Sequence, residues 1–142
     1  MTAPALQIRN CIVDFLRLEA GAFTLPVLPD QIRGMLDLSG TPKGLYGITV
    51  SAEDLGDHAG NTGRILVDIK PSITIWSHLE EDADGYECNT LTSDVLAIMQ
   101  EISYSLDGWA VAWNGNWTVS DTGIMDSFRQ VVLTATIPIM RQ

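Results

Sequence analysis

Acidic side chains crowd into the segment Glu80-Glu81-Asp82-Ala83-Asp84-Gly85, the part of the chain that comes closest to a metal-binding pattern. Oxygen ligands at alternate positions, with a glycine at the sixth, match the first half of a calcium-binding loop. The twelfth position is Leu91, so the bidentate carboxylate that closes such a loop is missing. We therefore predict a solvated acidic loop without a bound metal, formed by Glu80, Glu81, Asp82 and Asp84.

A second small cluster, Asp54, Asp57 and His58, combines two carboxylates with an imidazole. A single histidine beside loop carboxylates is more typical of a surface charge network than of a metal site. The cysteines Cys11 and Cys88 stand alone, without CxxC spacing or a nearby histidine, so we interpret them as reduced, buried apolar residues. No metal or other cofactor is therefore expected.

The sequence contains no GxSxG nucleophile elbow, no HExxH zinc motif and no glycine-rich phosphate loop with a lysine. Catalysis by dispersed aspartates and glutamates stays open, but no pair of them stands out. We predict that the protein is not an enzyme.

Charge limits the partners that this chain can bind. Eight lysines and arginines against eighteen aspartates and glutamates give a net charge of −10, which repels phosphate backbones and anionic lipids. Charged residues make up 18% of the chain, less than the about 25% of a typical soluble domain, so more of its surface must be neutral. We expect an oligomer that binds neither nucleic acid nor membrane.

The N-terminal segment and the apolar stretches bear on where the protein is found. Arg9, Asp14 and Arg17 interrupt the first apolar run, which also lacks the basic start of a signal peptide. No stretch approaches the about eighteen uncharged apolar residues of a membrane span. We expect the protein to be made and kept in a cytosol-like compartment.

The elements that must position these residues centre on Arg64 to His78, where apolar side chains alternate strictly. A period of two predicts a long strand with one face buried and one face exposed to water. Pro71 lacks a backbone donor, so the strand is expected to lie at a sheet edge or to be bulged at that point. Thr74, Trp76 and His78 share the polar parity, which predicts an exposed Trp76 that contacts another chain.

Two consequences follow from these assignments. If Trp76 is exposed, its replacement by serine leaves the monomer folded, whereas Ile75→Ser damages the core. If the acidic loop is solvated, it tolerates lysine at all four of its acidic positions, Glu80, Glu81, Asp82 and Asp84, without loss of the fold.

Periodicity, capping residues and turn residues outline the remaining elements. They are a helix from Pro4 to Ala20, an extended segment from Ala22 to Leu28, a short helical turn from Gln31 to Leu38, a strand from Gly44 to Ser51, a helix from Thr90 or Thr92 to Leu106, a hairpin of Trp109 to Trp113 and Trp117 onward around Asn114-Gly115, and a strand from Phe128 to Ile139. This order predicts an α+β fold, with two helices packed on one face of a mostly antiparallel sheet. A chain of 142 residues fits one compact domain, so we expect a single domain over residues 1–142.

A particular series of segments allows a comparison with a known family. The series comprises the N-terminal helix, the strand from Gly44 to Ser51, the long strand that ends in Ile73-Thr-Ile-Trp-Ser, the acidic loop, the helix from Leu91 to Leu106 and closing strands such as Phe128-Arg-Gln-Val-Val-Leu-Thr-Ala-Thr. This order resembles the tail terminator (tail completion) proteins of long-tailed bacteriophages. The similarity covers most of the chain and is most specific from Ile73 to Leu106, whereas Asp30 to Lys43 and the turn at Asn114-Gly115 match nothing in that family.

The resemblance implies a virion structural protein, assembled in the host cytoplasm, that forms a homohexameric ring at the head-proximal end of the tail tube. Such a ring stops polymerisation of the tube and offers a docking surface to the head. Its partners would be further copies of the chain, the tail tube protein and head-tail connector proteins, with DNA only as a passenger through the lumen. Thr74, Trp76 and His78 would contribute to the oligomer or tube interface, and the acidic loop would face solvent or the lumen.

Two other functions stay open. The protein could be a head-tail connector or neck protein of the same virion. It could also be a small cytosolic ligand-binding module or enzyme whose sheet face is lined by tryptophans, namely Trp76, Trp109, Trp113 and Trp117. A hexameric ring favours the virion functions, whereas a monomer or dimer with a deep pocket favours the ligand-binding function.

Overall fold

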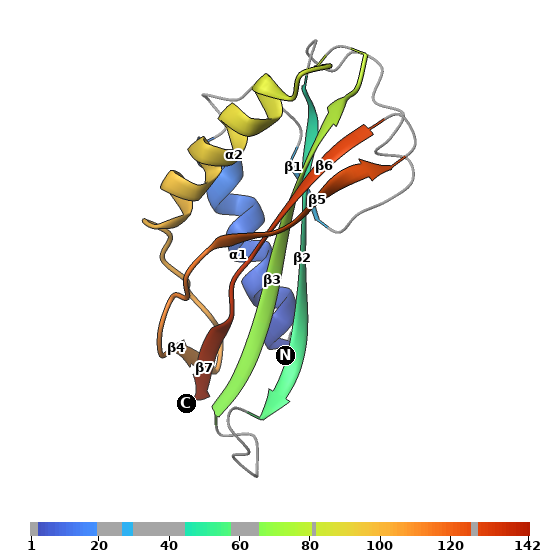
Figure 1. Cartoon of the computed structure of the whole chain (residues 1–142). Helices are drawn as coiled ribbons and strands as arrows, with labels where there is room; N and C mark the ends of the chain where they lie inside the picture. The colour runs from blue at the N-terminus through green and yellow to red at the C-terminus, as the bar shows by residue number, and fades with distance from the viewer. Residues whose placement is uncertain (1–2, 20–26, 30–44, 58–65, 81, 126–127) are drawn as a thin grey trace.

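The computed structural model describes residues 3–19, 27–29, 45–57, 66–80, 82–125 and 128–142. Both helices pack on the same face of a mostly antiparallel sheet (Figure 1), so the predicted α+β fold is confirmed. Within the described ranges the elements are α1 (Pro4–Glu19), β1 (Val27–Pro29), β2 (Leu45–Asp57), β3 (Leu66–His78), α2 (Tyr86–Met99), β4 (Trp109–Val111), β5 (Thr118–Met125), β6 (Phe128–Thr134) and β7 (Ile137–Arg141). Neither of these helices is long and apolar enough to cross a membrane.

The strand β3 lies in the middle of the sheet. It pairs antiparallel with β2 on one side and with β6 and then β7 on the other, in the order β1-β2-β3-β6-β5 with β4 beyond β7. The predicted edge position of this strand is therefore wrong. So is the predicted bulge at Pro71, because pairing with β2 runs without a register shift through Ala52 and Pro71.

Pro71 is accommodated by a break in the neighbouring strand. The Pro71 carbonyl accepts a hydrogen bond of 3.5 Å from the Ala135 N–H, so this side of the residue faces β6 and β7. In a strand the nitrogen and carbonyl of one residue point to the same neighbour, so the Pro71 nitrogen faces the gap between β6 and β7. Residues 135 and 136 separate these two strands, which sequence analysis predicted as one strand from Phe128 to Ile139.

The helix α1 forms as predicted, with Pro4 in its first turn, and ends at Glu19. Its buried side chains recur at helical spacing and pack mainly over β2 and β3: Ile8, Ile12, Val13 and Leu16. The Gln7 side chain ties the helix to a distant loop, since its amide accepts the Asp107 N–H (2.6 Å) and donates to the Asp107 carbonyl (3.2 Å). The loop that follows α2 is thereby held against α1.

The helix α2 begins at Tyr86, four residues before Thr90 and six before Thr92, the two predicted starts. Thr90 and Thr92 do not cap it, because their hydroxyls donate to the Tyr86 and Cys88 carbonyls one turn earlier, inside the helix. The helix ends at Met99 rather than at Leu106. Its buried face packs on β3 and β6 through Cys88, Leu91, Thr92, Val95 and Met99.

The predicted hairpin around Asn114-Gly115 is wrong. The strand β4 pairs with β7 and the strand β5 pairs with β6, so the two segments that flank Asn114-Gly115 do not pair with each other. Gly115 does adopt a left-handed conformation (φ 79°), and a Cβ there would stand 2.8 Å from the Thr136 carbonyl oxygen. The glycine of the predicted turn is thus left-handed as expected, but the strands that flank it pair with distant partners.

Other predicted segments agree with the structure only in part. The predicted strand from Gly44 to Ser51 is present in β2 from Leu45 onward and continues to Asp57, whereas Gly44 lies outside the described residues. The segment from Ala22 to Leu28 lies outside the described residues except for its last two, which belong to β1, and the predicted turn from Gln31 to Leu38 lies wholly outside them.

Trp76 is buried rather than exposed, so this prediction is also wrong. Its side chain is 3% exposed, and the indole N–H donates to the Thr49 hydroxyl at 3.0 Å. Ile73 and Ile75 lie in the core as predicted, and Trp76 points to the opposite face of β3. The alternating pattern correctly separated the two faces of β3. The face that carries Trp76 is, however, covered at this position.

We predict that Trp76→Ser lowers the free energy of unfolding by about 3–5 kcal/mol, because it removes a large buried side chain and leaves Thr49 without its donor. The matched control is Trp113→Ser, since Trp113 is 53% exposed and its loss should change stability by no more than about 0.5 kcal/mol. Urea unfolding of both variants measures the difference. Equal losses in the two variants would contradict the burial of Trp76.

Candidate functional site

The acidic loop is an organised N-terminal cap of α2. Asp82 is 3% exposed, and its two carboxylate oxygens accept the backbone N–H groups of Glu87 and Cys88, each at 3.0 Å. The Asp84 carboxylate accepts the Tyr86 N–H, also at 3.0 Å. Carboxylates at a helix N-terminus satisfy orphan donors and interact favourably with the helix dipole. The acidic side chains thus stabilise the start of the helix.

Arg129 connects this cap to the sheet. Its guanidinium, projecting from β6, donates to the Ala83 carbonyl at 2.9 Å. Gly85 adopts a left-handed conformation (φ 76°) beside it, and a Cβ at this position would stand 3.1 Å from the guanidinium carbon. The close approach explains why the residue before α2 is a glycine.

These contacts correct the predicted acidic loop. Glu80 and Asp84 are exposed, as a solvated loop requires, but Asp82 is buried, and Glu81 lies outside the described residues. Lysine at all four positions is therefore not compatible with the fold, because a lysine at 82 would remove both capping bonds. Among the residues that the structure describes, no group of three or more acidic, histidine or cysteine side chains is arranged to hold a metal ion.

The second predicted cluster is only partly described. The Asp54 carboxylate accepts the Gly56 N–H at 2.8 Å, next to a register shift of β2, so it stabilises a bulged turn of the backbone. Asp57 ends β2, and His58 lies outside the described residues. Asp54 therefore has a structural role in the backbone of β2.

The predicted interface residues on β3 lie on the face opposite Ile73 and Ile75. Thr74 and His78 are half-buried, and the His78 ring packs against Phe128 of β6 with 4.7 Å between ring centroids. Trp76 lies between them and is buried. An interface at Thr74, Trp76 and His78 stays a prediction, but it has lost the exposed tryptophan on which it was based.

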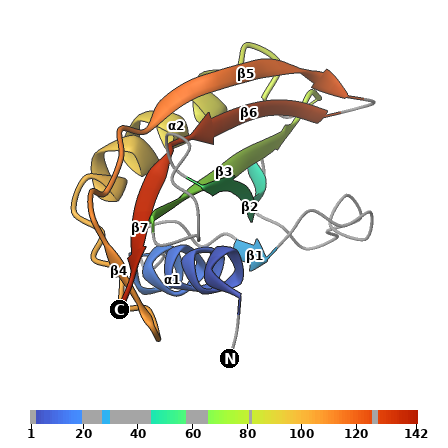
Figure 2. The same cartoon turned by 90° about the horizontal axis from the view of Figure 1, so that it is seen from below.

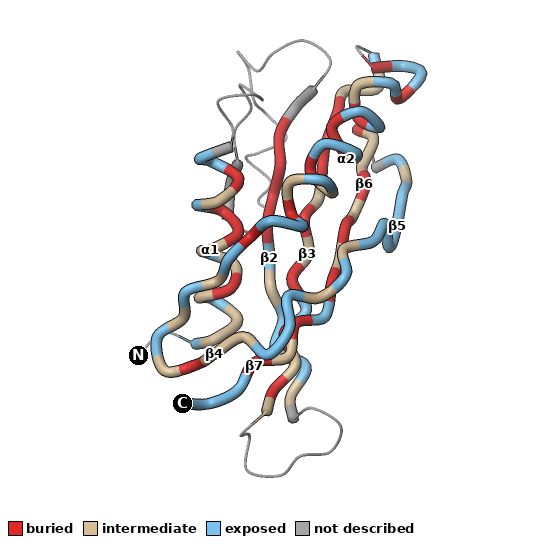
Figure 3. The backbone as a smooth tube through the Cα atoms, turned by 90° about the vertical axis from the view of Figure 1, so that its left-hand side faces the viewer, coloured by how far each residue is buried: buried red, intermediate tan, exposed pale blue. Residues whose placement is uncertain are grey.

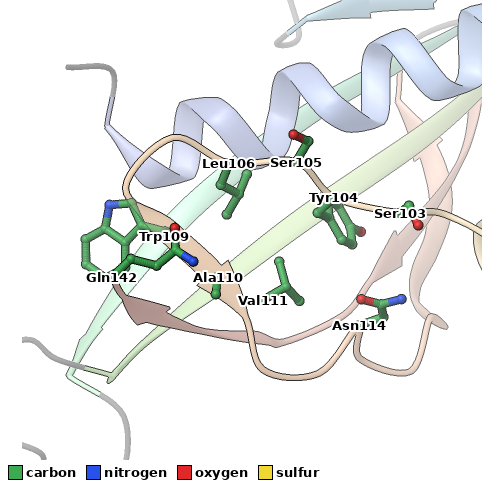
Figure 4. A pocket seen from close by; sticks show the side chains of 9 residues that line it. All are labelled: Ser103, Tyr104, Ser105, Leu106, Trp109, Ala110, Val111, Asn114 and Gln142. Carbon is green, nitrogen blue, oxygen red and sulfur yellow. The ribbon is translucent and has the colours of Figure 1, made fainter.

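A pocket of about 410 Å³ lies where the loop after α2 meets β4 (Figure 4). Its polar lining includes Ser103, Ser105 and Gln142. Of the four tryptophans, Trp109 is the one found in the described lining. Hydroxyls and amides of this kind can hydrogen-bond a small polar molecule. The described lining contains no carboxylate side chain, imidazole or thiol that could serve as a general base or nucleophile.

Tyr104 also lines this pocket. Burial raises the pKa of its phenol well above the usual value, because the ionised form would lose its hydration. Nearby, the Cys11 thiol on α1 donates to the Ser105 carbonyl at 3.5 Å. Burial also raises the pKa of the Cys88 thiol on α2, so Cys88 is a packed thiol and not an activated nucleophile.

The strand β5 carries exposed apolar side chains that sequence analysis missed. Ile124 is 63% exposed and Val119 is nearly half exposed, and Figure 3 shows exposure along most of the strand. A hollow of about 310 Å³ lies beside Ile124, between α2 and the pair β5–β6. The register shift between Val119 and Asp121 breaks the alternation of apolar residues in this strand, which hid its pattern.

The chain has no match among the family models and none among the curated proteins with which it was compared. The fold and the exposed surfaces described above therefore carry the functional argument. Two regions stand out, namely the pocket at Trp109 and the β5 edge with its hollow.

We predict that Asp82→Ala destabilises the protein by about 1–2 kcal/mol, because two N–H groups at the start of α2 lose their acceptor. Glu80→Ala is the matched control, since Glu80 is an exposed acidic residue of the same loop. Hydrogen exchange should accelerate at the Glu87 and Cys88 amides in the first variant only. Identical urea midpoints for the two variants would exclude a capping role for Asp82.

We also predict that Tyr104 makes stability fall at high pH. Its pKa is higher in the folded state than the value of about 10 in the unfolded chain, so its contribution is complete below about pH 10 and is lost as pH rises above it. Tyr104→Phe should flatten this fall between about pH 9 and 11, whereas Tyr86→Phe, at an exposed position, should retain it. Urea unfolding across this pH range measures both. Parallel profiles for Tyr104→Phe and the parent protein would refute the assignment.

Proposed function

We propose that this chain is a structural protein of a long-tailed bacteriophage virion, with the role of a tail terminator. Copies of the chain form a homohexameric ring on the end of the tail tube, stop its polymerisation and present a docking surface to the head. The observation that supports this proposal best is the arrangement of β3, the capped loop and α2. This continuous unit spans the part of the chain where the resemblance to tail terminators is most specific.

The charge of the chain agrees with this role. A net charge of −10 disfavours binding of DNA, so DNA passes through the ring as a passenger. Exposed carboxylates such as those of Glu80 and Asp84 would contribute to an acidic lumen. The low share of charged residues, 18%, leaves neutral surface for contacts between subunits and with the tube.

The alternatives differ in what they require. A connector or neck protein of the same virion would also form a ring but would bind at the head vertex and not at a free tube end. A ligand-binding module would use the pocket at Trp109 and would need no ring. Oligomeric state and location therefore separate the three functions.

We predict a ring of six copies in solution at high protein concentration or on cognate tail tubes. Native mass spectrometry and sedimentation measure the number of copies, and electron microscopy of tubes with bound protein locates the ring. Tubes polymerised with the protein should stop growing, whereas tubes alone should continue to lengthen. A monomer at every concentration, together with bare tube ends, would reject the proposal.

A further inference from the structure

The pocket at Trp109 is unusually polar for a ligand pocket. Five of its nine described lining residues carry hydroxyl or amide side chains, namely Ser103, Tyr104, Ser105, Asn114 and Gln142. Most small-molecule pockets are lined mainly by apolar side chains, with only a few polar groups. The volume of about 410 Å³ lies near the lower end of the range of about 300–1,000 Å³ that such pockets span. The pocket therefore suits a small molecule that is itself rich in polar groups.

The pocket also favours a ligand without charge. None of the nine described lining side chains is charged at pH 7. Arg141 holds its guanidinium over the Trp109 ring, 5.2 Å from the ring centroid, and is not part of the described lining. A charged ligand would lose hydration here without gaining a partner of opposite charge, and the net charge of −10 disfavours anions further.

The polar groups stand at both ends of the pocket, with apolar side chains between them. In Figure 4, Gln142 lies at one end and Asn114 at the other, and Ala110 and Val111 of β4 lie between them. Hydroxyl groups both donate and accept hydrogen bonds, as amide side chains do. A ring that bears hydroxyl groups on its rim and C–H groups on its faces therefore matches this arrangement.

Hydrogen bonds hold the walls of the pocket in place. The Asn114 side-chain amide donates to the Ile102 carbonyl at 3.1 Å, which leaves its side-chain oxygen to accept from a ligand. At the other end, the Gln142 N–H donates to the Gly108 carbonyl at 3.0 Å. The loop after α2 is thus tied at both ends of the pocket, and a site that is already formed loses less conformational freedom on binding.

Two buried donors beside this pocket lack an acceptor. The Tyr104 hydroxyl and the Trp117 indole N–H are buried, and neither has a hydrogen-bond partner among the described residues. The two groups are neighbours, since burial raises the pKa of the Tyr104 phenol and the nearby Trp117 N–H partly offsets this rise. A buried donor without an acceptor is destabilising. An oxygen atom of a ligand, on the side of the pocket that Tyr104 lines, would supply the missing acceptor.

We propose that the pocket at Trp109 binds one ring of a neutral sugar, whose hydroxyl groups hydrogen-bond to Asn114, Gln142 and Tyr104. A free monosaccharide and the terminal ring of a glycan present this same chemistry. The inference goes beyond the proposed tail-terminator function and does not rest on it.

NMR titration of the parent protein tests the site. Neutral methyl glycosides of the common hexoses should give saturable shifts at residues 103–111, Asn114, Trp117 and Gln142, with a dissociation constant of about 1 mM, the strength expected for about a dozen heavy atoms. Matched glycosides that carry a carboxylate or an ammonium group should bind about tenfold more weakly. Absence of saturable shifts at these residues with every neutral glycoside at about 50 mM would overturn the proposal, and so would tighter binding of a charged glycoside.

Alanine variants identify the amides that hold the sugar. Asn114→Ala and Gln142→Ala should each weaken binding about fivefold, because each removes a hydrogen-bonding group from one end of the pocket. Asn116→Ala is the matched control, since Asn116 is an exposed amide outside the described lining, and its loss should leave the affinity within about twofold of the parent. Equal losses in Asn114→Ala and Asn116→Ala would overturn the assignment.

Tyr104→Phe separates a role in binding from a role in folding. Because the phenol has no described partner to lose, the variant should keep the urea midpoint of the parent at pH 7. It should nevertheless bind the neutral glycoside about fivefold more weakly. A lowered midpoint together with unchanged affinity would assign the hydroxyl to the fold and overturn its part in the site.

A comparison of two ligands identifies the source of the sugar. An oligosaccharide that ends in the preferred hexose is titrated beside the methyl glycoside of that hexose. Equal affinities support a pocket for a single free ring, whereas about tenfold tighter binding of the oligosaccharide supports recognition of a glycan end. Neither result depends on ring formation by the protein, so the proposed tail-terminator function is tested separately by the oligomeric state.

Discussion

The pairing of β3 on both of its sides is the constraint on which the rest of the structure depends. Every backbone group of a central strand needs a partner, and Pro71 cannot donate. The chain meets this requirement by dividing the neighbouring strand into β6 and β7, so that the proline nitrogen faces the gap at residues 135 and 136. With β3 fixed in this way, its core face supplies the isoleucines over which α1 and α2 pack.

At the start of α2, an acidic residue that counts toward the net charge of the chain is buried rather than exposed. Asp82 belongs to the most acidic stretch of the chain, yet its carboxylate is buried and serves two backbone N–H groups. Arg129, nearly fifty residues away in sequence, holds the same loop through the Ala83 carbonyl. The helix position is thereby coupled to β6, and part of the formal charge of −10 has a structural role within the fold.

Local sequence patterns predicted the individual helices and strands well, but they did not predict which strands pair with each other. The helical spacing of Ile8, Ile12 and Leu16, and the strict alternation in β3, identified α1, β3 and the buried face of each correctly. Neither the central position of β3 nor the burial of Trp76 was visible in a local pattern, because both depend on strands that are distant in sequence. The Asp82 cap could have been predicted from the sequence, because an aspartate shortly before a helical segment is a known signal of a helix start. The hollow beside β5 could not be predicted, because it arises where three elements meet.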